Sequence, residues 1–277
     1  MASSDIGAAQ NKLVDLNGNV TENNGIAERA TLTPDSPMWG EHRSRYHFAA
    51  PYAAGKSVLD IACGTGFGEQ ILVDAGVGRI FAADYSEDAL LTTKELRTRN
   101  TDLLRTDGTS LPFEDGTFDV ITSFETVEHI PDYVGFVREL RRVLKKDGVM
   151  IMSTPNAHYT RPVNGVPINP FHVYEFTPEE FQDLLTRNFS GIELYGQRVT
   201  KNRRICPYWE LPDMLPTDAL SRIRIKLWKL QVRMPGAVRE GLSRIATGRS
   251  FFPGENDFIF SKDELKTGYV QVAVCRP

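Results

Sequence analysis

The chain has 277 residues, 41% of them hydrophobic, and a formal net charge of −4, which suits one large domain or one domain with an elaboration. This balance gives no support for a polyanionic partner of the whole chain. The three cysteines are scattered, so they predict neither a disulfide framework nor a metal pattern and fit a reducing, cytoplasmic compartment. The N-terminus lacks a secretory signal pattern, and no apolar run reaches the roughly 18 residues of a spanning helix.

Residues 1–35 are rich in turn-forming Asn and Gly and poor in apolar residues, which predicts a flexible N-terminal arm. The alternative is a lid that becomes ordered over a bound ligand. Residues 36–54 read as a helix that leads into the first strand of the core. A solvated helix face is one interpretation of its polar residues, and a ligand contact is the other.

A glycine-rich stretch follows, and the rest of the chain is organised around it. Residues 57–62 form an apolar run that carries one carboxylate, Asp60, and the glycines Gly64, Gly66 and Gly68 come directly after it. This order predicts a buried strand, a tight turn that can approach a ligand, and a helix from residue 69. Because a carboxylate at Asp60 would repel a pyrophosphate, the turn favours a cationic ligand over a dinucleotide.

Short apolar runs then alternate with helix-like segments. We expect further strands at 79–83, 103–104, 118–123 and 149–153. Helices are expected at 86–99 and 133–145, the second because its apolar residues fall at helical spacing. Thr177 opens a capping box with Pro178 at the first helical position, so another helix begins there. The alternation predicts a parallel, doubly wound sheet with its ligand at the carboxyl ends of the strands.

Two alternating runs, 192–197 and 269–275, predict the last two strands, and residues 199–268 form an insertion between them. Residues 198–249 carry twelve Lys and Arg against four Asp and Glu, so this part is basic. Residues 220–234 have an apolar stripe at helical spacing with a basic opposite face. That face is either solvated or meets an anionic substrate or a membrane surface.

The stretch from Asp60 to Gly68 resembles the D/E-x-G-x-G-x-G signature of class I S-adenosylmethionine-dependent methyltransferases, and the resemblance spans about residues 38–197 and the last strand. It implies a Rossmann-like α/β fold with a seven-stranded, mostly parallel sheet, an antiparallel last strand and helices on both faces. The implied domains are an arm at 1–35, a cofactor-binding core at 36–198, a basic helical cap at 199–268 and a final strand at 269–277.

The resemblance also assigns cofactor-binding residues. Asp84 ends the second strand, where a carboxylate can accept the ribose hydroxyls, although a plain strand-ending Asp is the alternative. Asp107 resembles the residue that accepts the adenine amine, and Phe124 and Glu125 would line the cofactor near its methyl group. The full expected set from this resemblance is Arg45, Tyr46, Asp60, Ala62, Gly64, Gly66, Asp84, Tyr85, Thr106, Asp107, Gly108, Phe124 and Glu125.

Two histidines are candidate catalytic residues. His129 lies in a run that resembles the E-x-x-E-H element of ubiquinone-biosynthesis O-methyltransferases, and it suits removal of a hydroxyl proton at neutral pH. His172 lies in Asn169–Thr177, which resembles the N-P-F-H-x-x-E-F-T run of methyltransferases linked to polysaccharide assembly. A structural role is the alternative for each. No group of His, Asp or Glu has metal-ligand spacing, so no metal is expected.

The sequence therefore predicts an S-adenosylmethionine-dependent methyltransferase that acts on oxygen in a small molecule, a sugar or a saccharide intermediate. The alternatives are an N-methyltransferase for a small amine or amino sugar, and a binding protein that holds the cofactor without turnover. Nucleic acid is not an expected partner, because no N-P-P-Y-like element follows the fourth strand. Peripheral membrane contact of the basic insertion stays open.

Overall fold

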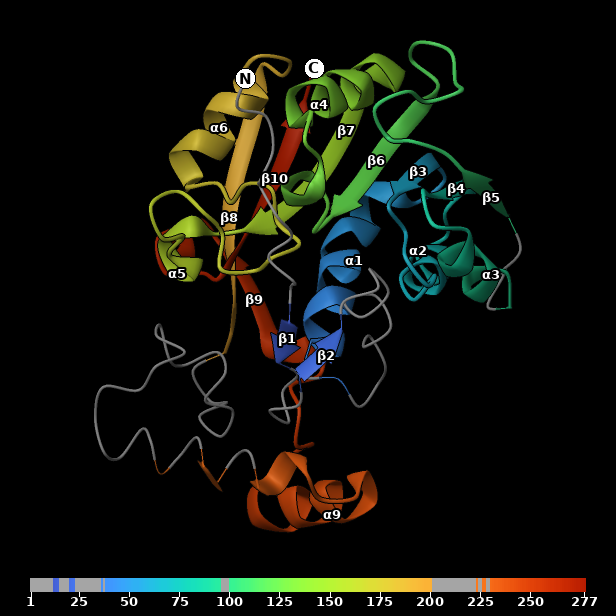
Figure 1. The fold of residues 1–277 in the computed structure, drawn as a ribbon. Coiled ribbons are helices and arrows are strands. Elements are labelled where there is room, and N and C mark those ends of the chain that lie inside the picture. Colours follow the sequence, from blue (N-terminus) through green and yellow to red (C-terminus); the bar gives the residue numbers. More distant parts are fainter. Residues whose placement is uncertain are drawn as a thin grey trace.

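A computed structural model of the chain describes residues 36, 38–95, 100–200, 223, 226–227 and 230–277, and the backbone of two short strands at 12–14 and 20–22. The core is one eight-stranded sheet with the order β5-β4-β3-β6-β7-β10-β8-β9 (Figure 1). Its strands are β3 (Ser57–Ile61), β4 (Arg79–Asp84), β5 (Thr101–Arg105), β6 (Phe118–Phe124), β7 (Leu144–Pro155), β8 (Gly191–Val199), β9 (Phe258–Ser261) and β10 (Val270–Arg276).

The parallel part of the sheet runs from β5 through β4, β3 and β6 to β7. The final strand β10 is antiparallel to both of its neighbours, β7 and β8, as predicted. The expected count of seven strands is wrong, because β9 adds an eighth by pairing antiparallel with β8. β9 lies inside residues 199–268, so part of the predicted insertion extends the core sheet.

Helices cover both faces of the sheet, as the alternation predicts. α1 (Trp39–Ala53), α2 (Glu69–Asp74) and α3 (Glu87–Glu95) pack on one face, and α4 (Tyr133–Val143) and α6 (Pro178–Thr186) pack on the other. Neighbouring strand residues point to opposite faces, so Val58 joins the first cluster and Leu59 the second. The short elements are α5 (Ala157–Thr160), η2 (Val127–His129), η3 (Glu255–Asp257) and η4 (Lys262–Glu264).

Two local predictions around the helices have different outcomes. The capping box is present, since the Thr177 side chain accepts from the Glu180 amide and the Glu180 side chain accepts from the Thr177 amide. The predicted boundary between helix 133–145 and strand 149–153 is wrong, because β7 already begins at Leu144. Leu144 is fully buried and pairs with Phe118 of β6, so sheet pairing replaces the last helical turn.

The predicted arm and cap are described only in part. Within residues 1–35, β1 (Lys12–Val14) and β2 (Val20–Glu22) form an antiparallel pair. α9 (Gly236–Thr247) stands apart from the sheet in Figure 1, and part of the predicted helix at 220–234 lies outside the described residues. Its described apolar positions Ile223, Leu227 and Leu230 are more than half exposed, so they do not pack on the described core.

A buried polar network connects α1 to β8, which lies near the antiparallel edge of the sheet. Arg45 is fully buried, and its Nε donates to Oε1 of Gln197 on β8 at 2.7 Å, while its Nη2 pairs with Glu41. The Gln197 amide nitrogen donates in turn to the Glu41 carbonyl at 3.0 Å and to Ser44 Oγ at 2.8 Å. One glutamine therefore satisfies a buried guanidinium and two polar groups of the helix.

We expect Gln197→Leu to lower the free energy of unfolding by about 1.5–3 kcal/mol, because it removes a hydrogen bond to a buried charge and leaves Arg45 short of a partner. Urea unfolding followed by circular dichroism measures the change. Gln70→Leu on the exposed side of α2 is the matched control and should change stability by less than about 0.5 kcal/mol. Equal effects of the two variants would contradict the assigned role of Gln197.

Candidate functional site

The carboxyl ends of the parallel strands bring most of the predicted cofactor residues to one edge of the sheet. Asp60 lies in β3, Asp84 ends β4, and Phe124 ends β6. Asp107 follows β5, and Glu125 follows β6 directly. Because neighbouring parallel strands end at the same edge, residues that are far apart in the sequence face one ligand-sized region.

The glycine turn has the backbone that the sequence predicts. Ala62, Gly64 and Gly66 have φ values of 60°, 60° and 77°, in the left-handed region that favours glycine. A Cβ at Gly66 would lie 2.6 Å from Thr93 Cγ2, whereas a Cβ at Gly64 would meet nothing within 4 Å. The turn therefore needs glycine at Gly66 for packing, and at Gly64 its backbone is open to a ligand.

Asp60 is buried at the centre of this edge and receives two hydrogen bonds. Tyr46 Oη donates to one carboxylate oxygen at 2.9 Å, and Thr122 Oγ1 donates to the other at 2.6 Å. The Tyr46 ring meets the Phe124 ring edge to face, with centroids 5.0 Å apart. Burial raises the pKa of Asp60 to about 7, and nearby Asp84 adds to this rise, while the two hydrogen bonds oppose it.

Asp84 shapes the glycine turn. One of its oxygens accepts from the Gly64 amide at 3.0 Å, and the other accepts from the Ser86 amide at 2.8 Å. The adjoining Tyr85 has a 70% exposed side chain, so its ring lies open at this edge. A carboxylate that already orders the turn is also in position to accept hydroxyl groups of a ligand bound against Gly64.

The segment after β5 continues the edge. The Thr106 amide donates to the Asp84 carbonyl at 3.1 Å, which ties the two strand ends together. Asp107 is exposed, and its pKa is lowered by hydrogen bonds from the amide and hydroxyl of Thr109. A Cβ at Gly108 would lie 2.6 Å from the Phe136 ring, so glycine is needed there for packing on α4.

Sequence reasoning missed one acidic residue, Glu69, in the first turn of α2. Its side chain is buried, and neither carboxylate oxygen has a hydrogen-bond partner among the described residues. Burial, followed by the charge of Asp60, raises its pKa to about 8. The sequence could have indicated this residue, because Glu69 directly follows the third glycine of the turn. Two carboxyls in one dry region suit a ligand that brings positive charge.

Arg45 is placed differently from the other predicted cofactor residues, because its guanidinium is enclosed by the network with Glu41 and Gln197. Its Nη2 also lies 3.8 Å from Oε2 of Glu125. Glu125 has a left-handed backbone with φ of 49°, and its Oε1 accepts from Ser153 Oγ at 2.7 Å. Arg45 thus contributes a positive charge next to Glu125.

Both predicted catalytic histidines meet beside this edge. His129 ends η2, His172 lies in the long segment before α6, and their rings stand 4.8 Å apart between centroids. His129 Nδ1 lies 3.0 Å from the Phe171 carbonyl, and His172 Nδ1 lies 2.7 Å from Glu175 Oε1. Since these oxygens can only accept, Nδ1 is the donor in each ring, and a ring in its neutral form then has its lone pair on Nε2.

Glu128 lies next to the two histidines and is fully buried. Thr154 Oγ1 donates to its Oε2 at 2.9 Å, and its backbone carbonyl accepts from the Val173 amide at 2.7 Å. Glu128, His129 and His172 offer ligand atoms that all lie within 4.8 Å of one another. The separation of these residues along the chain does not reveal such a group, which forms only when the long segment folds back over η2.

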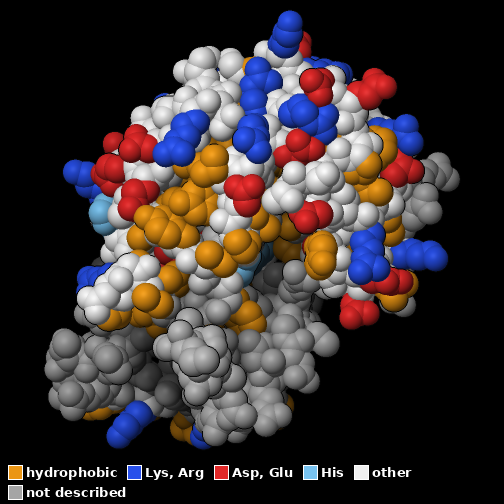
Figure 2. All heavy atoms as spheres, turned by 45° about the horizontal axis from the view of Figure 1, so that its top comes forward, with side chains coloured by type: hydrophobic (Ala, Val, Ile, Leu, Met, Phe, Trp, Pro, Cys, Tyr) orange, Lys and Arg blue, Asp and Glu red, His pale blue; other side chains and the backbone are white. Residues whose placement is uncertain are grey.

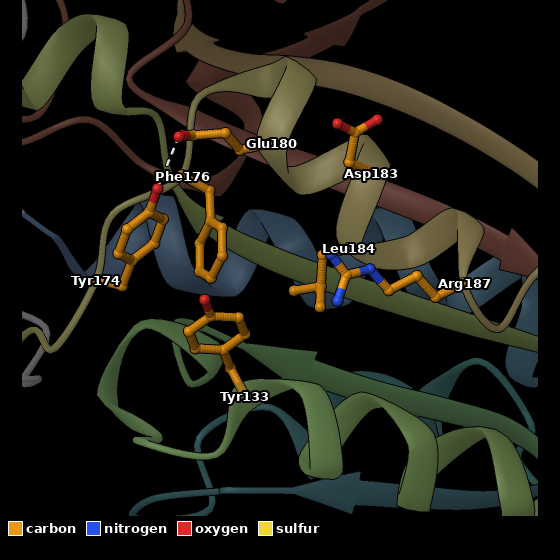
Figure 3. A pocket seen from close by; sticks show the side chains of 7 residues that line it. All are labelled: Tyr133, Tyr174, Phe176, Glu180, Asp183, Leu184 and Arg187. Atoms are coloured by element: carbon orange, nitrogen blue, oxygen red, sulfur yellow. Dashed lines mark hydrogen bonds between the residues drawn. The ribbon is translucent and has the colours of Figure 1, made fainter.

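A separate hollow is lined by a different set of residues. It lies between α4 and α6, and Figure 3 shows Tyr133, Tyr174 and Arg187 around it, with Tyr174 Oη donating to Glu180 Oε1 at 2.7 Å. None of the predicted cofactor or catalytic residues lines it. The chemistry-bearing groups therefore gather at the strand ends and not in this hollow.

Comparisons with known proteins agree with this geometry. The sequence model of the methyltransferase domain family matches residues 59–152. A probable S-adenosylmethionine-dependent methyltransferase of Mycobacterium tuberculosis is 35% identical over 145 residues, which cover 52% of this chain and 52% of that protein. A demethylmenaquinone methyltransferase of Lactococcus lactis is 34% identical over 115 residues, covering 39% of this chain and 45% of that protein. The chain spans about half the length of the curated relatives it matches.

Solved structures share the fold at low sequence identity. An S-adenosylmethionine-dependent methyltransferase from Archaeoglobus fulgidus aligns over 86% of this chain and 93% of its own, with a TM-score of 0.53 and 17% identity. The [4+2]-cyclase SpnF aligns over 86% of this chain and 81% of its own, with a TM-score of 0.53 and 16% identity. Family match, relatives and fold agree with the strand-end site: residues 59–152 match the methyltransferase domain family, and this part of the chain is similar to class I S-adenosylmethionine-dependent methyltransferases, which implies S-adenosylmethionine as the cofactor.

Proposed function

We propose that this protein transfers a methyl group from S-adenosylmethionine to a hydroxyl oxygen of a small molecule, a sugar or a saccharide intermediate. The observation that carries the choice of oxygen is the pair His129 and His172, whose Nδ1 protons are held by Phe171 and Glu175. A neutral ring held in this way has its lone pair on Nε2, which is what removal of a hydroxyl proton requires, and at His172 the hydroxyl would replace the Asn169 amide that lies 2.9 Å from Nε2. A neutral amine acceptor would need no such base.

The residues at the strand ends fit the cofactor. Asp60 and Glu69 are buried carboxyls, and no Lys or Arg among the described residues forms an ion pair with either of them. A ligand with a sulfonium and an ammonium group would supply the positive charge. Asp84 would hold the ribose beside the open backbone of Gly64. Asp107 would hold the adenine, and Phe124 and Glu125 would face the reacting end.

S-adenosylmethionine, when bound, supplies an electrophilic methyl group on its sulfonium. The protein's part is to align the acceptor with that group, which contributes up to roughly 7–11 kcal/mol in well-oriented reactions. In this proposal one histidine accepts the hydroxyl proton at Nε2, and Glu175 stabilises the resulting positive charge on His172. On the cofactor side the Tyr46 ring packs edge to face against the rings of Phe67 and Phe124, so the proposed site has an apolar wall there.

Several features bear on the identity of the acceptor. The name demethylmenaquinone methyltransferase, carried by relatives from several bacteria, points to a small-molecule acceptor in those proteins and supports the same class here. Among the described residues on the face shown in Figure 2, acidic and basic side chains are intermixed, and they form no continuous basic surface for a nucleic-acid backbone. Among the described residues, no helix is both long and apolar enough to cross a bilayer.

We also propose a role for residues 199–268 and a cellular location. Residues 199–268 are proposed to cap the acceptor side, with basic residues that can meet an anionic group such as a diphosphate. A cytoplasmic location is proposed because the thiols of Cys63 and Cys275 are buried and unpaired by disulfides. N-methylation, the first alternative, predicts that neither histidine controls the rate, and binding without turnover predicts no methyl transfer at all.

Cofactor binding gives the first test. We expect calorimetry to show binding of S-adenosylmethionine and no binding of NAD. Asp84→Asn should weaken the cofactor by about 1.5–3 kcal/mol, because the neutral amide is a poorer acceptor for ribose hydroxyls. Asp102→Asn, at an exposed ion pair on β5, is the matched control and should leave the affinity unchanged. Binding of NAD alone would contradict the assignment.

The two buried carboxyls predict that the affinity for the cofactor depends on pH. Both pKa values are raised, to about 7 for Asp60 and about 8 for Glu69, so both groups are largely neutral at pH 6 and ionised at pH 9. The affinity for the cationic cofactor should therefore rise over this range, most of all above pH 7, and Glu69→Gln should flatten the upper part of the rise. Isothermal titration at pH 6, 7, 8 and 9 measures it. An affinity that falls with pH would refute the charge argument.

The histidines give a test of turnover. With labelled cofactor and pools of sugars, glycans and phenols as acceptors, His129→Ala or His172→Ala should lower kcat by about 10²–10⁴-fold, the usual loss for a general base. Cofactor affinity should stay nearly constant. His158→Ala, at a half-exposed histidine of α5, is the control and should keep the wild-type rate. Full rates in both site variants would favour a nitrogen acceptor or catalysis by positioning alone.

A further inference from the structure

Six large hydrophobic side chains near the C-terminal half of the insertion are open to solvent. Each is at least half exposed, and they form two sets with the same spacing, which together we call the apolar row: Ile223, Leu227 and Leu230, then Val238, Leu242 and Ile245. Both sets lie in helical backbone, the second in α9. Spacings of four and three residues put the members of each set on one side of a helix. Exposed apolar side chains that gather in this way commonly mark an interaction surface.

The other side of α9 is attached to the core. Arg239 is buried, its guanidinium lies 4.6 Å from the centre of the Phe252 ring, and its Nη1 donates to the Val232 carbonyl at 3.2 Å. Glu240 Oε2 accepts from the Phe251 amide at 2.9 Å, and Phe251 is buried in the core cluster on the α1 face of the sheet. Because these contacts use one side of the helix, the α9 part of the apolar row is left facing solvent.

The stretch that carries the apolar row is strongly basic. Residues 222–249 contain eight Lys and Arg and one acidic residue, Glu240. Among the described residues, the exposed cations of this stretch are Lys226, Arg233, Arg244 and Arg249. The charge of Glu240 is used within α9, where its Oε1 accepts from Arg244 Nε at 2.7 Å. The surface therefore combines aliphatic side chains with an excess of positive charge.

We propose that the apolar row and its cations form a peripheral docking surface for a bilayer that contains anionic lipids. A helix with aliphatic residues on one side and basic residues beside them lies in the plane of a membrane, with its apolar side at the boundary between headgroups and acyl chains. Anionic headgroups attract the Lys and Arg side chains, so one partner satisfies both features. A second copy of the chain fits less well, because a symmetric pairing of this face would bring its positive charges together.

The position of α9 determines which edge of the sheet would face the bilayer. Figure 1 shows α9 beyond the carboxyl ends of the parallel strands β6 and β7. The residues after α9 lie against α1, since a Cβ at Gly40 would lie 2.3 Å from the Pro253 carbonyl oxygen, and Arg43 Nε lies 2.6 Å from Glu255 Oε2. Arg43 Nη1 donates in turn to the Phe67 carbonyl of the glycine turn at 3.0 Å. A docked α9 would therefore place the strand-end site on the membrane side of the protein.

Co-sedimentation of the full-length protein with lipid vesicles tests the docking surface. One set of vesicles is pure phosphatidylcholine, and the other is an equal mixture of phosphatidylcholine and phosphatidylglycerol. We expect the protein to bind the anionic vesicles at least about tenfold more tightly than the neutral ones, and added salt should reduce this difference. Docking requires neither cofactor nor acceptor, so it can be measured whatever the acceptor is.

Two double variants separate the apolar contribution from the charged one. Leu242→Gln combined with Ile245→Gln should weaken binding to the anionic vesicles by about tenfold or more, because it removes two aliphatic side chains from the membrane interface. Glutamine forms helices nearly as well as leucine, so α9 should persist in this variant. Lys226→Glu combined with Arg249→Glu should weaken binding to the anionic vesicles by about tenfold and leave binding to the neutral vesicles unchanged.

Each double variant has a matched control elsewhere on the surface. Leu91→Gln changes an exposed leucine of α3, and Lys146→Glu changes an exposed lysine near the start of β7, at the opposite edge of the sheet from the strand-end site. Both should bind the anionic vesicles as the wild type does. Far-ultraviolet circular dichroism and the thermal midpoint report whether every variant is folded.

Three results would overturn the docking surface. The first is a wild type that does not sediment with the anionic vesicles, or that binds both kinds of vesicle equally. The second is a folded Leu242→Gln, Ile245→Gln variant that binds as tightly as the wild type. The third comes from sedimentation velocity without lipid: a wild-type dimer that this variant dissociates would assign the apolar row to a second copy of the chain.

Discussion

A buried carboxylate, Asp60, sets the arrangement of the cofactor edge. Its two oxygens accept from Tyr46 of α1 and Thr122 of β6, so one side chain of β3 fixes the positions of two neighbouring elements. These two hydrogen bonds do not offset the loss of hydration, and the pKa of Asp60 stays raised. With Glu69 buried close by, ionisation is disfavoured at two neighbouring carboxyls, and a cationic ligand would favour their ionised forms. Stability and ligand preference therefore come from the same constraint.

The position of α1 links the two halves of the site. Its Tyr46 reaches Asp60 at the cofactor edge, while Arg45, the next residue back, is anchored to Gln197 of β8 and approaches Glu125. Adjacent residues on a helix point about 100° apart, so one turn can serve both tasks. A change in the packing of α1 would therefore shift Asp60 and Glu125 together, and both belong to the proposed cofactor site.

The shared fold does not by itself specify the reaction. The same architecture occurs in a methyltransferase from Archaeoglobus fulgidus and in the [4+2]-cyclase SpnF, so the sheet and its glycine turn provide a place for a ligand and not a particular acceptor. In this chain the distinguishing groups lie on η2 and in the segment between β7 and α6. That segment brings His172 and Glu175 next to Glu128 and His129, where the proposed function places the acceptor.

The sequence by itself determined the alternating α/β order, the glycine turn and the carboxylates Asp60 and Asp84, because these depend on local backbone needs and on strands that end at a common edge. It could not determine the eighth strand, since β9 is four residues long and is recognisable only by its pairing with β8. It also could not show that Arg45 is enclosed by Gln197 or that Glu128, His129 and His172 share one site. Those contacts join residues far apart in the chain, and only tertiary packing decides which buried polar groups meet.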